Sequence, residues 1–255
     1  MLILGIVGSP RKDGRSNALV EAALQGASAA GAQVEKLYLV DYPIRQFISG
    51  GGSGEGVRFC PVELSQRCEA ADAIVLGAPV YWGDINGLTK DWMDSVRISN
   101  ASGKPALGAA VAGGSGKGLL SGVQSIYHFF YHKQMRAIDP TPVSRFNLDE
   151  ALAGLQVSGA RLAEMARHPK PFPGTAWDDR WPDVVAYYAA VPYLNGDPVD
   201  EFMMLARQLL KISTGERVPA ALAEFDIALA ALERGERAAA GFHATRCYQM
   251  LFYNG

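Results

Sequence analysis

Residues 8–17 (GSPRKDGRSN) combine glycine with side chains that bind phosphate. Ser9 and Ser16 offer hydroxyl groups, Asn17 offers an amide, and Arg11 offers a cation. The glycines in this segment let the backbone approach a ligand closely. A helix that begins here would add free N–H groups and a dipole, and both favour an anion. The residue types therefore predict a phosphate site, and a solvated turn with a helix cap is the alternative.

Residues 78–90 (APVYWGDINGLTK) place two aromatic side chains next to each other in a turn. Pro79 and Gly83 shape the turn, and Tyr81 and Trp82 lie within it. Aromatic side chains on a loop that faces a ligand favour a planar guest. Packing of the loop against another part of the chain explains the same residues equally well.

Residues 112–118 (AGGSGKG) contain four glycines, which leave backbone N–H groups exposed and make room for a flat ring. The segment is not a P-loop, because Gly118 follows Lys117 where that motif needs Ser or Thr. The dinucleotide fingerprint GxGxxG follows none of the predicted strands. Nucleotide hydrolysis and a Rossmann dinucleotide site are therefore disfavoured. The three segments together fit a phosphorylated planar cofactor.

Alternating strands and helices are predicted to bring these segments to one edge of a sheet. Short apolar runs bounded by Gly or Pro are typical of buried parallel strands, and helix-forming runs lie between them. Ligands bind at the carboxyl ends of such strands, which all three segments follow. The expected strands are 2–7, 34–40, 73–77, 106–112 and 135–143, and the expected helices are 16–30, 88–96, 119–131 and 148–167.

Two local features concern the last expected strand and the last expected helix of this series. Pro140 and Pro142 weaken the last strand, since proline cannot donate to a sheet ladder. Asn147 precedes the helix at 148–167 and Glu150 stands three residues later, which predicts a capping box.

The chain is predicted to divide into an α/β domain at 1–168 and a helical extension at 169–255. Residues 168–174 (HPKPFPG) form a proline-rich break between the two. In the extension, Asp197 before Pro198 predicts an N-cap followed by proline at the first helical position. Pro219 opens a second helix, and a third is expected near the C-terminus.

Composition disfavours several classes of protein. The chain has 255 residues, with 24 Lys+Arg against 26 Asp+Glu, which argues against a mainly electrostatic nucleic-acid binder. Three cysteines cannot form a four-cysteine cluster, and His128 and His132 lack the Glu of an HExxH motif, so no metal site is expected. No apolar stretch approaches the ~20 residues of a membrane span and no signal peptide is evident, so we expect a cytoplasmic location.

Together, GSPRKDGRSN (8–17), ADAIVLGAPVYWGDINGLTKDWMDS (71–95) and AAVAGGSGKG (109–118) resemble the flavodoxin-like family of NAD(P)H-dependent FMN reductases and its iron–sulfur flavoprotein relatives. The resemblance covers about residues 1–125. It implies a doubly wound parallel sheet of five strands in the order 2-1-3-4-5, here with a C-terminal helical appendage, and it implies noncovalently bound FMN.

The resemblance also implies cofactor contacts, residue by residue. The first segment would bind the FMN phosphate, the second would contact the isoalloxazine ring, and the third would cover the ring from another side. The residues assigned in this way are Ser9, Arg11, Ser16 and Asn17; Pro79, Val80, Tyr81, Trp82 and Gly83; and Ala112, Gly113, Gly114 and Gly116.

One region departs from the iron–sulfur relatives. Their compact cysteine cluster after the second strand has no counterpart here, where residues 44–60 hold only Cys60 and Cys68 follows nearby. The glycine-rich stretch 50–56 is either a gate to the site or a linker.

The implied activity is hydride transfer from NADPH or NADH to bound FMN, and from there to an acceptor such as a quinone, a flavin or a small molecule. No acid–base or nucleophilic side chain is required, and none is assigned. A homodimer or homotetramer is expected, because family members usually form one. The alternatives are an electron-transfer flavoprotein reduced by a protein partner, an FMN-dependent dehydrogenase of a specific metabolite, and a flavin-binding module without turnover.

Overall fold

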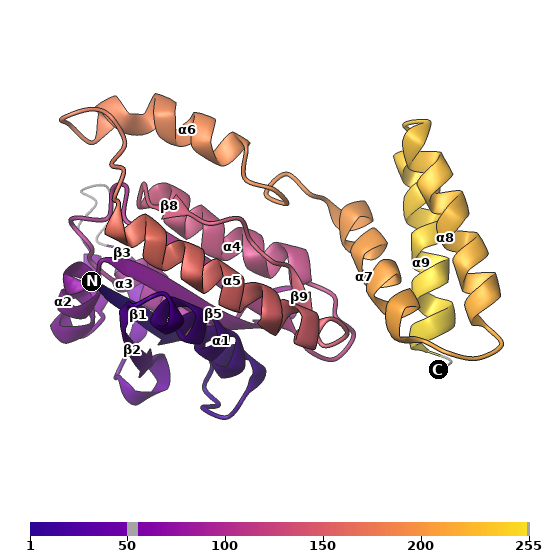
Figure 1. Cartoon of the computed structure of the whole chain (residues 1–255), viewed down its shortest axis with the longest axis horizontal. Helices are drawn as coiled ribbons and strands as arrows, with labels where there is room; N and C mark the ends of the chain where they lie inside the picture. Colours follow the sequence, from indigo (N-terminus) through magenta and orange to yellow (C-terminus); the bar gives the residue numbers. More distant parts are fainter. Residues whose placement is uncertain (50–55, 254–255) are drawn as a thin grey trace.

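The computed structural model describes residues 1–49 and 56–253, and it places a parallel sheet between two layers of helices (Figure 1). The sheet has the order β2-β1-β5-β7-β8, and β9 also pairs with β7. Its strands are β1 (Leu2–Val7), β2 (Gln33–Tyr38), β5 (Ala73–Tyr81), β7 (Pro105–Ala112), β8 (Arg136–Ala137) and β9 (Val143–Ser144). The predicted flavodoxin-like fold class is confirmed.

Helices cover both faces of this sheet because its central strands β1, β5 and β7 are mostly apolar, and every residue of β7 is buried. One face carries α1 (Arg15–Ala29) and α5 (Leu148–Arg167). The two helices pack closely, since a Cβ on Gly26 or Gly159 would lie 1.8 Å from a carbonyl oxygen of the other helix. The other face carries α2 (Val62–Ala70), α3 (Gly87–Ser95) and α4 (Leu119–His132).

The strand order departs in detail from the expected five strands. The segment predicted as one strand at 135–143 contains only β8, and β9 begins at its last residue, with Pro140 and Pro142 between the two. A short strand, β6 (Asp84–Ile85), pairs antiparallel with the end of β5. β8 pairs with the first residues of β7, whereas β6 and β9 pair with the last residues of β5 and β7 and so lie at the carboxyl edge of the sheet.

The segment that follows β2 forms regular structure outside the main sheet. After the 3₁₀ turn η1 (Leu39–Asp41), β3 (Arg45–Ser49) and β4 (Gly56–Phe59) form an antiparallel pair. The suggested gate at 50–56 lies outside the described residues except for Gly56.

The capping box predicted at the start of α5 is wrong. Asn147 directs its side chain backward: its Oδ1 accepts from Ser144 N at 2.9 Å, and its Nδ2 donates to Pro142 O at 3.2 Å. The Asn147 side chain is therefore bonded within the turn before α5 and does not cap that helix.

The residues after α5 fall into two parts (Figure 1). The first contains η2 (Asp178–Arg180) and α6 (Trp181–Ala189), and it packs on the sheet domain. The hydroxyls of Tyr187 and Tyr188 donate to Ala137 O and Met135 O, at 2.7 and 2.9 Å, beside β8. The second part, α7 (Pro198–Ile212), α8 (Val218–Glu233) and α9 (Arg237–Phe252), projects from one end of the domain and packs around a core to which Ala112 and Leu119 of the sheet domain also contribute. We call it the three-helix unit; the domain boundary at 168/169 stays a prediction.

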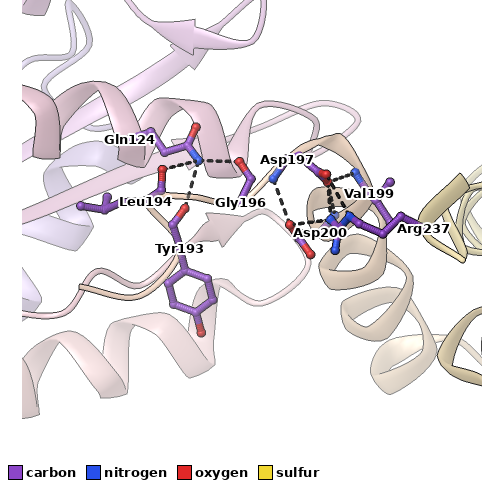
Figure 2. Close-up of polar contacts among 8 residues, drawn as sticks. All are labelled: Gln124, Tyr193, Leu194, Gly196, Asp197, Val199, Asp200 and Arg237. Carbon is purple, nitrogen blue, oxygen red and sulfur yellow. Dashed lines mark hydrogen bonds and ion pairs between the residues drawn. The ribbon is translucent and has the colours of Figure 1, made fainter. Parts of the chain in front are cut away.

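A strap, residues 190–197, leads from α6 to the three-helix unit and is held at its middle and at its C-terminal end (Figure 2). On α4, Gln124 Nε2 donates to the carbonyl oxygens of Tyr193 and Gly196, at 3.0 and 2.9 Å. At the start of α7, Asp197 and Asp200 form a reciprocal capping box, and Arg237 of α9 pairs with both carboxylates. The predicted N-cap at Asp197 is confirmed.

Candidate functional site

A cavity of about 950 Å³ opens at the carboxyl ends of β1, β5 and β7. Its volume lies in the range of roughly 300–1,000 Å³ usual for cofactor sites. All three segments singled out in the sequence contribute to its wall. The lining residues are Ser9, Arg11, Asp13, Gly14, Arg15 and Ser16; Pro79, Val80, Tyr81, Trp82 and Gly83; and Val111, Gly113, Gly114, Ser115 and Lys117.

The first wall is the turn from β1 into α1, residues 8–17. Helix α1 begins at Arg15, directly after Gly14, so its first N–H groups lie at the cavity. Ser9 is buried, and its Oγ accepts from Arg11 N at 3.1 Å. The Arg15 side chain reaches the opposite wall, where Nη1 would lie 3.7 Å from a Cβ on Gly113. These features form a cradle for an anion.

A buried polar network holds this turn against the second wall. Asn86 Nδ2 donates to Gly8 O at 2.9 Å, and the Thr89 hydroxyl lies 2.7 Å from Asn86 Oδ1 and 3.2 Å from Gly8 O. Asn86 and Thr89 are themselves buried, and Thr89 lies so close that a Cβ on Gly8 would be 1.9 Å from its hydroxyl oxygen. The sequence analysis assigned neither residue. The only available signal was that Asn86 and Thr89 are polar residues three positions apart in the segment 85–90 (INGLTK).

The second wall ends in a tight aromatic turn between β5 and β6. Tyr81 pairs with Asp84, and the two residues between them both have positive φ, +54° at Trp82 and +89° at Gly83. This is the pattern of a type I′ hairpin turn, which favours Asn or Gly and makes tryptophan unusual. The Trp82 side chain is fully exposed at the rim, and Tyr81 is about half exposed.

The third wall is the glycine loop, residues 112–118, between β7 and α4. Gly116 N donates to Gly113 O at 2.7 Å, and Gly114, Gly116 and Gly118 all have positive φ. Only glycine takes up such a run of left-handed conformations without strain.

Three of the assigned residues lie away from the cavity. Asn17 faces β2, where its Oδ1 accepts from Lys36 Nζ at 2.9 Å and from Tyr38 OH at 3.1 Å. Ala112 is buried in the core shared with the three-helix unit. Gly116 packs outward, because a Cβ there would meet Leu205 and Phe146. The other assigned positions all line the cavity.

Comparisons with known proteins identify this arrangement. Residues 1–146 match the model of the NADPH-dependent FMN reductase family. The chain belongs to that family. It is an oxidoreductase of the FMN reductase type and a flavoprotein.

Two curated relatives match part of this chain. An iron–sulfur flavoprotein of Methanocaldococcus jannaschii is 31% identical over 153 residues, which span 55% of this chain and 79% of the relative. An iron–sulfur flavoprotein of Archaeoglobus fulgidus is 33% identical over 99 residues, 37% of this chain and 44% of the relative.

Solved structures show the same fold. An NADH:FMN oxidoreductase in its apo form aligns with a TM-score of 0.52 at 19% identity, over 70% of this chain and 93% of the other. An NAD(P)H:quinone oxidoreductase from Methanothermobacter marburgensis aligns with a TM-score of 0.51 at 19% identity, over 64% of this chain and 98% of the other. At these identities the likeness concerns the fold.

The charges of the cavity suit the FMN reductase family's cofactor. Among its described lining residues, Arg11, Arg15 and Lys117 stand against one carboxylate, Asp13, which pairs with Arg11 at 3.6 Å. Positive charge, helix N–H groups and a glycine loop without side chains fit a phosphate at one end and a flat ring at the other. The residues present therefore fit FMN.

The three cysteines are free thiols; Cys68 and Cys247 are buried, and Cys60 is half-buried. Burial raises the pKa of Cys68 to about 12 and also raises that of Cys60, so both stay protonated at neutral pH. Within residues 1–49 and 56–253, no group of three or more His, Cys, Asp or Glu side chains could hold a metal ion. Over the same ranges, no helix is long and apolar enough to cross a bilayer.

Proposed function

We propose that this protein takes hydride from NADPH or NADH onto FMN bound in the cavity and passes the electrons to a small acceptor. Quinones, flavins and other small planar molecules are the acceptor classes we infer. The supporting observation is the convergence of three walls on one cavity: an anion cradle, an aromatic turn and a glycine loop. Each wall suits a different part of FMN.

The chain's residues would bind and orient the cofactor. The phosphate would lie at the start of α1, with Ser9, Ser16 and the N–H groups of the first turn as donors and Arg11 and Arg15 as counter-ions. The ring would lie between the aromatic turn and the glycine loop. FMN, when bound, supplies the redox chemistry itself. No side chain has to supply a proton or a nucleophile.

The cavity mouth would receive the electron donor and the acceptor. Tyr81 and the fully exposed Trp82 stand at this rim. Aromatic faces stack on planar rings, so a nicotinamide or a quinone could be held over the flavin in turn.

The test is spectroscopic. The purified protein is incubated with FMN, freed of excess, and its visible absorption spectrum is recorded. NADPH and NADH are then titrated in separately without oxygen. We expect a retained flavin spectrum that bleaches with at least one nicotinamide. A protein that retains no flavin would contradict the cofactor assignment, and retained flavin that neither nicotinamide bleaches would favour an electron-transfer flavoprotein.

We also propose that the chain self-associates through the three-helix unit. Leu222, Ile227 and Phe242 are each about half exposed on α8 and α9. Contact with a second copy of the chain would cover apolar side chains of this kind. Sedimentation velocity of the full chain is expected to show a dimer or tetramer, and a monomer at micromolar concentration would contradict this.

A further inference from the structure

Helix α4 begins without a cap of its own, and the three-helix unit supplies one. Its N-cap is Gly118, at φ +87°, which has no side chain to accept from the first amides. Glu201, in the first turn of α7, reaches this end of α4. Both its carboxylate oxygens lie 3.0 Å from Gly118 N, and Oε2 lies 3.2 Å from Leu120 N. The carboxylate also complements the positive end of the helix dipole.

The capped point is where two walls of the cavity meet. A Cβ on Gly118 would lie 2.7 Å from both Gly83 Cα and Val80 Cγ1, so the glycine loop rests directly on the aromatic turn. One turn further along α4, Ser121 Oγ donates to Gly83 O. The first turn of α4 therefore supports the aromatic turn, and Glu201 holds that first turn.

A second residue of the three-helix unit holds the same loop. The hydroxyl of Tyr248, on α9, donates to Ser115 O at 2.8 Å. Burial raises the pKa of Tyr248 to about 12, so this donor is present throughout the physiological range. Lys117 Nζ lies 5.6 Å from the ring centres of Phe202 and Tyr248, which ties the loop to α7 and α9 by cation–π contacts.

We propose that Glu201 is a positioning residue of the flavin site: carried in by the three-helix unit, it holds the glycine loop and the aromatic turn in the geometry that receives the isoalloxazine ring. This role rests on the proposed function. It gives the three-helix unit a part in cofactor binding, although that unit lies outside the matched residues 1–146.

The charge of Glu201 adds a second, electrostatic effect. Reduction of a bound flavin adds electrons to the ring, and a fixed carboxylate at the adjoining helix end opposes added negative charge. The same helix end, without the carboxylate, would favour it. Removing the charge while keeping an acceptor oxygen should therefore raise the midpoint potential of the bound flavin.

Three full-length variants separate these effects. Glu201→Ala removes both the charge and the acceptors, Glu201→Gln keeps one acceptor oxygen, and Glu150→Gln is the matched control. Glu150 pairs with Lys211 at 2.9 Å and so also joins the sheet domain to the three-helix unit, but at the start of α5, outside the cavity lining. FMN dissociation constants are measured by fluorescence quenching, and midpoint potentials by dye-coupled reduction.

We expect Glu201→Ala to raise the FMN dissociation constant about tenfold or more, as for loss of a charged hydrogen-bonding partner. Glu201→Gln should restore most of the affinity and shift the potential upward, and Glu150→Gln should match the wild type in both. Tyr248→Phe, which keeps the ring and removes only the hydroxyl, should weaken FMN several-fold, and it decides the matter if Glu201→Ala does not fold.

The outcomes separate the two proposals. Wild-type protein that does not bind FMN overturns the proposed function, and the positioning role falls with it. Wild-type protein that binds FMN, with Glu201→Ala and Tyr248→Phe equal to it in affinity and Glu201→Gln equal in potential, overturns the positioning role alone. A loss of affinity in Glu150→Gln as large as in Glu201→Ala also overturns it, since the effect would then come from general loosening of the three-helix unit.

Discussion

The phosphate-side turn at residues 8–17 and the glycine loop at residues 112–118 face each other across one cavity, but they are held in different ways. The turn is held from within the sheet domain, where Asn86 and Thr89 contact Gly8 O through polar side-chain groups. The glycine loop is fixed from outside it, where Glu201 and Tyr248 reach in from the three-helix unit.

This difference separates what the fold provides from what the extension adds. The grip on the turn comes from residues about 80 positions away, within the part of the chain that matches the family. The grip on the loop comes from residues 83 and 133 positions away, beyond the matched part. The phosphate end of the site should therefore survive damage to the three-helix unit, and the ring end should not.

The largest expected effect is at Gly8. Gly8→Ala would place a methyl group 1.9 Å from the buried Thr89 hydroxyl, and the packed network cannot yield without moving the turn. We expect the free energy of unfolding to fall by about 2–3 kcal/mol and FMN retention to be lost. Chemical denaturation and the flavin spectrum measure both. Gly87→Ala, with no atom within 4 Å of the added carbon, is the control and should behave like the wild type.

Arg15 and Arg11 offer a sharper test of the phosphate end. Arg15 reaches across toward Gly113, whereas Arg11 is largely exposed and shares its charge with Asp13. We expect Arg15→Ala to weaken FMN by about 1.5–3 kcal/mol, the range for charged hydrogen bonds, and Arg11→Ala by less. Isothermal titration of FMN into apoprotein ranks the two. The reverse ranking would place the phosphate nearer Arg11.

A pair of hydroxyl deletions tests the separation of the two walls directly. Thr89→Val removes the hydroxyl that contacts Asn86 Oδ1 and Gly8 O, and Tyr248→Phe removes the hydroxyl that donates to Ser115 O, each at a cost of about 1 kcal/mol. Amide hydrogen exchange should quicken at residues 8–17 in the first variant and at residues 113–118 in the second. If either variant loosens both segments equally, the walls are one cooperative unit and the contrast drawn here is wrong.

We expect Trp82 to favour binding of the nicotinamide or the acceptor while lowering the free energy of unfolding. Its φ of +54° is unfavourable for tryptophan and suits asparagine in a type I′ turn. Trp82→Asn should raise the free energy of unfolding by up to about 1 kcal/mol and raise KM for nicotinamide or acceptor. Thermal unfolding and steady-state kinetics measure these. Trp177→Asn, at an exposed tryptophan with φ −57°, should give no such gain.

The smallest expected effect is a pH dependence inside the three-helix unit. A hydrogen bond from Arg237 is the main reason that the pKa of Asp197 lies below its ordinary value. The ionised carboxyl therefore contributes stability above about pH 4, which is lost as the pH falls through the lowered pKa. Arg237→Gln should be slightly less stable than the wild type at neutral pH, since the pair is exposed, and equal to it in strong acid. A difference in stability between Arg237→Gln and the wild type that persists in strong acid would show that it does not come from the ionised Asp197 carboxyl.

Much of the fold followed from local patterns. Apolar runs marked the strands at 2–7 and 106–112, and the helix predicted at 148–167 has those bounds in the structure. Proline explains the main irregularity, since Pro140 and Pro142 split the last strand into β8 and β9. The cap expected at Asn147 does not form, because the Asn147 side chain bonds to the backbone of Ser144 and Pro142 in the preceding turn and not to the first amides of α5.

The candidate site was predicted less completely. Loop composition and family resemblance together pointed to most of the cavity lining, because glycine, hydroxyl and aromatic residues after strands leave a local signal. Asn17 was assigned to the phosphate site, but its side chain contacts Lys36 and Tyr38 of β2. The direction in which a residue in the first turn of α1 faces depends on how that helix lies against β2. Arg15, Asn86 and Thr89 were not assigned, because their roles depend on what lies opposite them.

The sequence by itself determined the alternation of strands and helices, the positions of the three segments after their strands, and the cofactor class that they resemble. These follow from short-range periodicity and turn chemistry, which a single chain displays in order. Only the tertiary structure decided that α7 would deliver Glu201 to the first amides of α4, and that Tyr248 would close the same loop. Such contacts join residues far apart in the chain, and their geometry depends on the packing of whole helices rather than on any local pattern.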